Sequence, residues 1–91
     1  MLKKSKLIFL LKQLNIKIYG ATEKAEKNIY QTDFKSSQAI IMGSEGKGLS
    51  RSVVDLCDEL IKIPLLGKIE SLNVSVACGT ILYEIVRQKA Y

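Results

Sequence analysis

A continuous apolar run that stops at a glycine-rich turn limits the folds open to this chain. Residues 39–42 read Ala-Ile-Ile-Met, and Gly-Ser-Glu-Gly-Lys-Gly follows directly at 43–48. A short apolar run bounded by turn residues is typical of a strand buried on both faces, as in parallel sheets covered by helices. We therefore expect residues 39–42 to form a buried strand of an α/β sheet.

Helical and strand-like segments alternate along the rest of the chain. In order, the predicted elements are a helix ending near Asn15, strands over 16–20 and 39–42, a helix capped by Ser50, a strand over 60–63 and a helix over 72–89. This alternation predicts an α/β fold with a mainly parallel sheet and helices on both faces. Since no boundary is visible, residues 1–91 are expected to form a single domain.

Two of the predicted helices have apolar faces. Leu7, Leu11 and Leu14 share one face of the first helix. A broader stripe on the last helix, wide enough for a core and a partner subunit, consists of Val74, Ala77, Cys78, Ile81, Leu82 and Ile85. The polar stretch 21–38 predicts a long loop with a helical turn around 23–27, and loops of this length are often functional.

Composition excludes several kinds of site. The chain has no histidine, and Cys57 and Cys78 do not form a Cys-x-x-Cys pair, so neither a zinc site nor histidine-based catalysis is expected. Both cysteines lie among apolar residues, which favours buried free thiols. Lysines interrupt every apolar run, and the short patch 7–11 lacks a cleavage site, so we expect neither a membrane span nor a signal peptide, but a cytoplasmic protein.

The net charge of +5 has two interpretations. A positive excess favours polyanionic partners, nucleic acid above all. The alternative is a lysine-rich surface that only keeps the protein solvated, because the lysines are spread along the whole chain. Charge by itself does not decide between them.

Segments with unusual backbone requirements follow the predicted strands. They are residues 20–22, 43–48 and 64–67, the last of which leads to 71–73. Ligands bind outside the carboxyl ends of parallel strands, and glycines allow close approach of the backbone, so this edge is a candidate nucleotide-like site. Leu49 after Gly48 excludes a P-loop, and no G-x-G-x-x-G follows the first strand. The alternative is that the glycines serve only tight turns.

Two of these segments resemble signatures of the SpoU (TrmH-like) family of RNA ribose 2′-O-methyltransferases. Residues 40–49, Ile-Ile-Met-Gly-Ser-Glu-Gly-Lys-Gly-Leu, resemble the second signature. Ile63-Pro64-Leu65 followed by Ser-Leu-Asn-Val-Ser-Val-Ala at 71–77 resembles the third, with Leu65 in place of the usual methionine, a change of similar volume. Their order and separation argue against chance similarity, and the resemblance extends to Arg87.

The resemblance implies an α/β trefoil knot that holds S-adenosylmethionine, with tRNA or rRNA as substrate and a homodimer as the assembly. It implies a catalytic site with Glu45, Ser71 and Asn73, and cofactor contacts from Gly43, Gly46, Ile63, Leu65 and Leu72. The alternative for the polar residues is structural. In that case Glu45 stabilises its loop, Ser71 caps the last helix and Asn73 bonds the backbone.

One family signature is not matched. It is an Asn-Gly segment leading to an arginine, and the only arginines are Arg51, interpreted as a phosphate or surface contact, and Arg87. We therefore expect the C-terminal, cofactor-binding part of such an enzyme, truncated at the N-terminus and weakly active or inactive alone. The alternative is a degenerate knotted module that binds RNA or a partner subunit without transferring methyl groups.

Overall fold

The chain alternates helices and strands in the predicted order. The computed structural model describes residues 4–44, 47–65 and 72–91. Its elements are α1 (Lys4–Gln13), β1 (Lys17–Ala21), the 3-10 turn η1 (Ile29–Gln31), β2 (Gln38–Met42), α2 (Arg51–Leu56), β3 (Glu59–Ile61) and α3 (Val74–Ala90).

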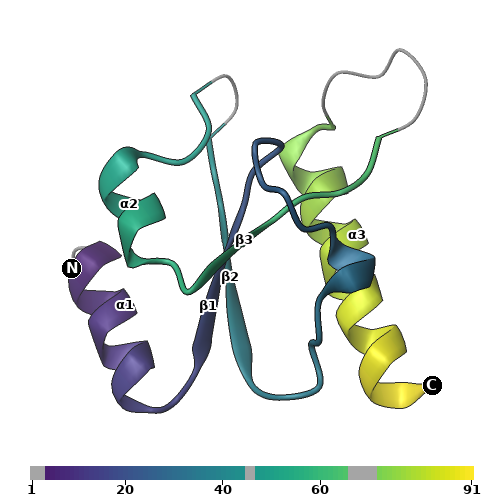
Figure 1. Cartoon of the computed structure of the whole chain (residues 1–91), viewed down its shortest axis with the longest axis horizontal. Coiled ribbons are helices and arrows are strands. Elements are labelled where there is room, and N and C mark those ends of the chain that lie inside the picture. The colour runs from purple at the N-terminus through teal and green to yellow at the C-terminus, as the bar shows by residue number, and fades with distance from the viewer. Residues whose placement is uncertain (1–3, 45–46, 66–71) are drawn as a thin grey trace.

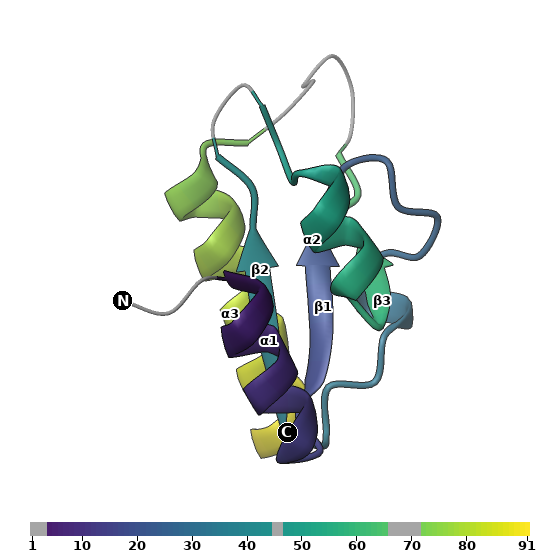
Figure 2. The ribbon, with the colours of Figure 1, turned by 90° about the vertical axis from the view of Figure 1, so that its left-hand side faces the viewer.

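The strands form one parallel sheet. The strand order is β2-β1-β3, and both pairings with β1 are parallel. Figure 1 shows α1 and α2 on one side of the sheet and α3 with η1 on the other. Seen from the side, α1 and α2 lie over the same face of the sheet (Figure 2). The predicted α/β fold with helices on both faces is therefore confirmed.

β2 differs from its prediction as a fully buried strand. Within the described residues it pairs with β1 alone, and all of its residues are half-buried. The central strand is β1, where Ile18 is 0% and Tyr19 is 2% exposed. An apolar run shows that a segment avoids water, but it does not show which strand lies in the middle of the sheet.

The main core lies between the sheet and α3. Tyr19 of β1 meets Phe34 edge-to-face, with ring centroids 5.2 Å apart. Other buried residues of this cluster are Ile29, Ile61, Ile81 and Ile85. On the opposite face, a Cβ on Gly20 would lie 2.8 Å from the Cys57 sulfur and 3.0 Å from Leu60 Cδ2, so glycine allows the end of α2 to pack closely on β1.

The helices bury faces that differ in part from the predicted ones. On α1, Ile8 is buried, whereas Leu7 is 47% exposed, and Leu14, which follows the helix, is 69% exposed. On α3, Leu82 is 50% exposed, and the helix begins at Val74 instead of residue 72. Periodicity identifies an apolar stripe, but the setting of the helix against the sheet decides which part of the stripe is covered.

The helical turn in the polar segment after β1 lies later than predicted. The sequence predicts it around residues 23–27, but η1 spans Ile29–Gln31. Asn28 Oδ1 accepts hydrogen bonds from the N–H groups of Tyr30 and Gln31, and the Gln31 side chain accepts one from the N–H of Asn28 at 3.0 Å. This capping box fixes where the turn begins.

The buried carboxylate of Glu84 contacts Gln88, which links α3 to the segment after η1. Glu84 is 4% exposed and accepts two hydrogen bonds from the Arg87 guanidinium, at 2.7 and 2.8 Å. Gln88 donates to Glu84 and to the Thr32 carbonyl, both at 2.8 Å, and its side-chain oxygen accepts from the N–H of Phe34 at 2.7 Å. The hydrogen bonds from Arg87 first, and then that from Gln88, lower the pKa of Glu84 from 4.5 to about 2 against the opposing effect of burial.

Glu84 is expected to stabilise the fold only while it is charged. Because the folded-state pKa is depressed, its contribution is present above the unfolded value of 4.5 and is lost as the pH falls towards 2. At neutral pH, Glu84→Gln is expected to cost about 1–2 kcal/mol, a modest value because Arg87 is half-exposed. Thermal unfolding followed by circular dichroism from pH 7 to 2 should show a shallower loss for Glu84→Gln than for the parent.

The matched control is Asp55→Asn. Asp55 is 64% exposed and its pair with Arg51 spans 3.5 Å, so this substitution should leave the pH profile unchanged. Superimposable profiles for Glu84→Gln and the parent would remove the assigned role of Glu84.

Candidate functional site

A hollow of about 900 Å³ opens at the carboxyl ends of the strands. Its walls come from the loops after β1 and β2, the segment after β3, and the beginnings of α2 and α3, which gather at the upper end of Figure 1. The volume lies within the range of small-ligand sites, about 300–1,000 Å³. This is the edge of the sheet where the sequence predicts a ligand.

The hollow brings together residues from both sequence motifs. The predicted site residues that line it are Gly43, Ile63, Leu65, Leu72 and Asn73. Glu45, Gly46 and Ser71 lie outside the described residues. Gly43 comes from one sequence motif and the other four residues come from the second, so both motifs contribute to the same cavity.

The backbone after β2 packs tightly on Gly43. The N–H of Gly48 donates to the Ser44 carbonyl at 2.9 Å, and Gly48 has a φ of +68°, in the left-handed region that favours glycine. A Cβ on Gly43 would lie 2.7 Å from Gly48 Cα and 2.8 Å from the Leu49 nitrogen. The backbone of the loop itself therefore requires a glycine at position 43. The same packing shapes one wall of the hollow.

Asn73 is the N-cap of α3, a role that the structural alternative gave to Ser71. Its side-chain oxygen accepts a hydrogen bond from the N–H of Ser75 at 2.8 Å, and its carbonyl accepts one from the N–H of Ala77 at 2.8 Å. The hydrogen bond from the backbone to Asn73, which the structural alternative proposed, is therefore present in the structure. Since Asn73 also lines the hollow, it joins the beginning of α3 to the site.

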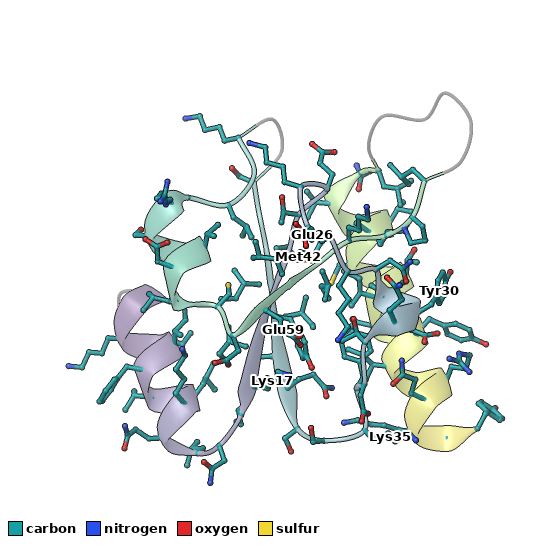
Figure 3. The ribbon with its side chains drawn as sticks, in the orientation of Figure 1. Lys17, Glu26, Tyr30, Lys35, Met42 and Glu59 are labelled. Atoms are coloured by element: carbon teal, nitrogen blue, oxygen red, sulfur yellow. The ribbon has the colours of Figure 1, made fainter. Side chains whose placement is uncertain are left out.

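Apolar side chains also line the hollow. Ile63, Leu65 and Leu72 are half-buried there, together with Met42, which the sequence did not single out as a site residue. Figure 3 shows Met42 at the upper end of β2. A flat, apolar ligand that covers these half-buried side chains removes their apolar surface from water, and this favours binding of the ligand.

Basic residues line the hollow as well, and the sequence did not predict them as a group. They are Lys24, Lys47, Arg51 and Lys62, called the cation rim below. Their spacing along the chain follows no motif, so only the folded structure shows that they share a site.

The described residues favour neither a metal site nor a reactive cysteine. No group of three or more His, Cys, Asp or Glu among them is placed to hold a metal ion. Cys57 and Cys78 are free, as predicted, but half-buried instead of fully buried. Burial raises the pKa of the Cys57 thiol, which disfavours the nucleophilic thiolate.

No helix in the described ranges is long and apolar enough to span a bilayer.

Comparison with protein families decides the classification. The model of the SpoU rRNA methylase family matches residues 3–83. This chain belongs to the SpoU methylase family. The family predicted from the two sequence motifs is therefore confirmed.

Curated relatives of this SpoU-family chain include rRNA methyltransferases. It is 45% identical over 80 residues to the 23S rRNA (guanosine-2′-O-)-methyltransferase RlmB of Ralstonia nicotianae, an alignment that covers 88% of this chain and 32% of the relative. It is 47% identical over 79 residues to RlmB of Vibrio cholerae, with coverage of 87% and 32%. The chain thus spans about a third of the length of these relatives.

Solved structures of SpoU methyltransferases share the fold of this chain. The methyltransferase AviRb of Streptomyces viridochromogenes, solved in complex with the cofactor AdoMet, matches with a TM-score of 0.86 and 30% identity, over 94% of this chain and 36% of AviRb. The trefoil knot implied by the family resemblance stays a prediction.

Proposed function

We propose that residues 1–91 form a single, incomplete C-terminal domain that binds S-adenosylmethionine within an RNA ribose 2′-O-methyltransferase. The observation that carries this proposal is the convergence of Gly43, Ile63, Leu65, Leu72 and Asn73 on one hollow. The substrate is rRNA or tRNA, and the compartment is the cytoplasm. The 2′-O-methyltransferases among the relatives support this assignment.

The residues of the hollow fit the cofactor. Ile63, Leu65 and Leu72 offer apolar surface for the adenine ring, and Gly43 lines the same hollow. The bound cofactor supplies an electrophilic methyl group carried on a sulfonium. Because the reaction needs the ribose 2′-oxygen aligned with that methyl group, the main task of this chain is to hold both reactants in place.

Asn73 organises the site from the beginning of α3. Its side-chain oxygen is held by the N–H of Ser75 at 2.8 Å, which fixes its position at the hollow. Glu45 and Ser71 are proposed to organise the same site, on the basis of the family motifs. Among the described lining residues the ionisable groups are Glu23 and the cation rim. The family signature that carries an arginine, expected to activate the ribose hydroxyl, is not matched in this chain, so we propose that the chain alone is weakly active or inactive.

A homodimer through α3 is part of the proposal. Leu82, Tyr83 and Val86 of α3 are 50%, 72% and 50% exposed. Apolar and aromatic side chains gathered on one helix favour a protein interface. A second copy of the chain would cover them.

A non-enzymatic module that binds RNA or a partner subunit is the second candidate. The unmatched arginine signature favours it, because neither Arg51 nor Arg87 follows an Asn-Gly segment of that kind. Arg87 is bound to Glu84, and Arg51 lies 91% exposed on α2. Such a module needs no cofactor, and this separates the two candidates.

Calorimetric titration of the purified chain tests the proposal. S-adenosylmethionine and its demethylated product are expected to bind saturably, with dissociation constants of about 1 μM to 1 mM and one site per chain. Adenosine shares the adenine ring and ribose but lacks the methionine portion, so it should bind more weakly. A folded chain that binds neither methionine-containing ligand would favour the non-enzymatic module.

A further inference from the structure

We infer that the cation rim, Lys24, Lys47, Arg51 and Lys62, is the phosphate-binding surface that holds the RNA backbone at the mouth of the hollow. This inference rests on the proposed function, because it names the substrate contacts of the same site.

Different walls of the hollow contribute these cations. Lys24 lies in a tight turn after β1, in which the N–H of Ala25 donates to the Thr22 carbonyl at 3.1 Å. Lys47 precedes Gly48 in the loop after β2, and Arg51 is the first residue of α2. The lining cations therefore come from different segments of the chain instead of one helix face.

Lys62 is held at its place after β3 by backbone hydrogen bonds. Its N–H donates to the Lys27 carbonyl at 3.0 Å, and its carbonyl accepts from the N–H of Ile29 at 2.9 Å. The Lys62 backbone is thus fixed by the segment that precedes η1. A fixed backbone reduces the conformational entropy lost when the side chain binds a phosphate.

Three lysines outside the hollow, Lys12, Lys17 and Lys27, pair with carboxylates. Lys17 and Lys27 pair with Glu59 at 2.9 and 3.5 Å, and Figure 3 shows Lys17 beside Glu59. The hydrogen bond with Lys17 lowers the pKa of Glu59 and raises that of Lys17. Lys12 pairs with Asp58 at 3.5 Å. These lysines are therefore less available to an anionic ligand.

The rim is not neutralised in this way. Lys24, Lys47 and Lys62 form no ion pair with any residue in the described ranges, and Arg51 makes only a solvated 3.5 Å pair with Asp55. Glu23 is the one carboxylate among the described lining residues. Uncompensated charge around a concave surface raises the local positive potential and attracts polyanions.

The cofactor does not account for these cations. S-adenosylmethionine carries a positive sulfonium and a positive ammonium group but a single carboxylate, so surplus lysines around its site repel it. RNA carries a negative phosphate at each nucleotide. Of the two reactants, RNA is the one whose charge complements the rim.

Two triple variants of equal charge test the inference. The rim variant is Lys24→Gln/Lys47→Gln/Lys62→Gln, and the control is Lys6→Gln/Lys35→Gln/Lys89→Gln, whose lysines are exposed, lie outside the hollow and form no ion pair with described residues. Each variant removes three positive charges from a chain of net charge +5, which leaves +2 in both. Binding of a fluorescein-labelled single-stranded 20-nucleotide RNA is followed by fluorescence anisotropy over a series of KCl concentrations, and circular dichroism checks folding.

The rim variant is expected to bind the RNA at least about tenfold more weakly than the parent. The slope of log affinity against log salt should fall by about 2, since each lost phosphate contact on a single strand removes about 0.7. The control should lose no more than about threefold, through long-range charge alone.

The outcomes separate this inference from the proposed function. Equal losses in the two variants, or a parent that binds S-adenosylmethionine but not the RNA, would overturn the inference alone. A parent that binds the RNA through the rim but not S-adenosylmethionine would overturn the proposed function and leave the phosphate-binding surface in place.

Discussion

The Gly43→Ala variant is expected to lose about 3 kcal/mol of its free energy of unfolding. Its new methyl group would lie 2.7 Å from Gly48 Cα and 2.8 Å from the Leu49 nitrogen, and these backbone atoms cannot rotate away. For a domain of this size, each kcal/mol lowers the midpoint of thermal unfolding by about 4–8 °C. Because the clash displaces one wall of the hollow, S-adenosylmethionine binding is expected to weaken as well.

The control for this substitution is Gly79→Ala. A Cβ at Gly79 meets no atom within 4 Å, and the residue lies inside α3. Alanine is therefore expected to raise the free energy of unfolding by about 0.5–1 kcal/mol, through its higher helix propensity. Chemical denaturation of both variants measures the two opposite changes. Equal stabilities for Gly43→Ala and the parent would show that the loop after β2 relaxes freely.

The Leu72→Asp variant is expected to weaken S-adenosylmethionine binding by about 2–4 kcal/mol, or roughly 30- to 1,000-fold. Leu72 is half-buried and lines the hollow, next to the N-cap of α3. A carboxylate at this position faces the proposed adenine surface, and burying it without a partner costs several kcal/mol. Calorimetric titration of the variant measures the change.

Leu14→Asp is the matched control for Leu72→Asp. Leu14 is 69% exposed, just after α1, and does not line the hollow, so cofactor affinity should equal that of the parent. Parent-like affinity in Leu72→Asp would remove Leu72 from the cofactor site. Weaker binding in both variants would point to a general effect of added negative charge instead of a local one.

The burial of Glu84 with Arg87 and Gln88 was not predictable from the sequence. The predicted apolar stripe of α3 includes Leu82 and not Glu84. In the structure, however, Glu84 is buried and Leu82 is 50% exposed. Glu84 satisfies its carboxylate through Arg87 and Gln88, one turn away on the same helix. Such local pairs are visible in a sequence, but their burial depends on the segment around Thr32 and Phe34, which packs there only in the folded chain.

Much of the candidate site was predictable because its residues lie in two contiguous motifs. Gly43, Ile63, Leu65, Leu72 and Asn73 were identified from these motifs, and all of them line one hollow. Arg51 was interpreted as a phosphate or surface contact, but the cation rim as a group was not predicted, because its members come from separate segments and lysines occur throughout the chain.

The sequence alone determined the order of helices and strands, the parallel α/β class and the family. These properties depend on hydrophobic periodicity and on motif spacing, which are local in the chain. Only the tertiary structure decided that β1 is central, that β2 is a half-buried edge strand of the described sheet, and that the lysines around the hollow share one site. The physical reason is that strand order and the contacts between loops depend on long-range pairing and packing. The same local sequence patterns are compatible with several such arrangements.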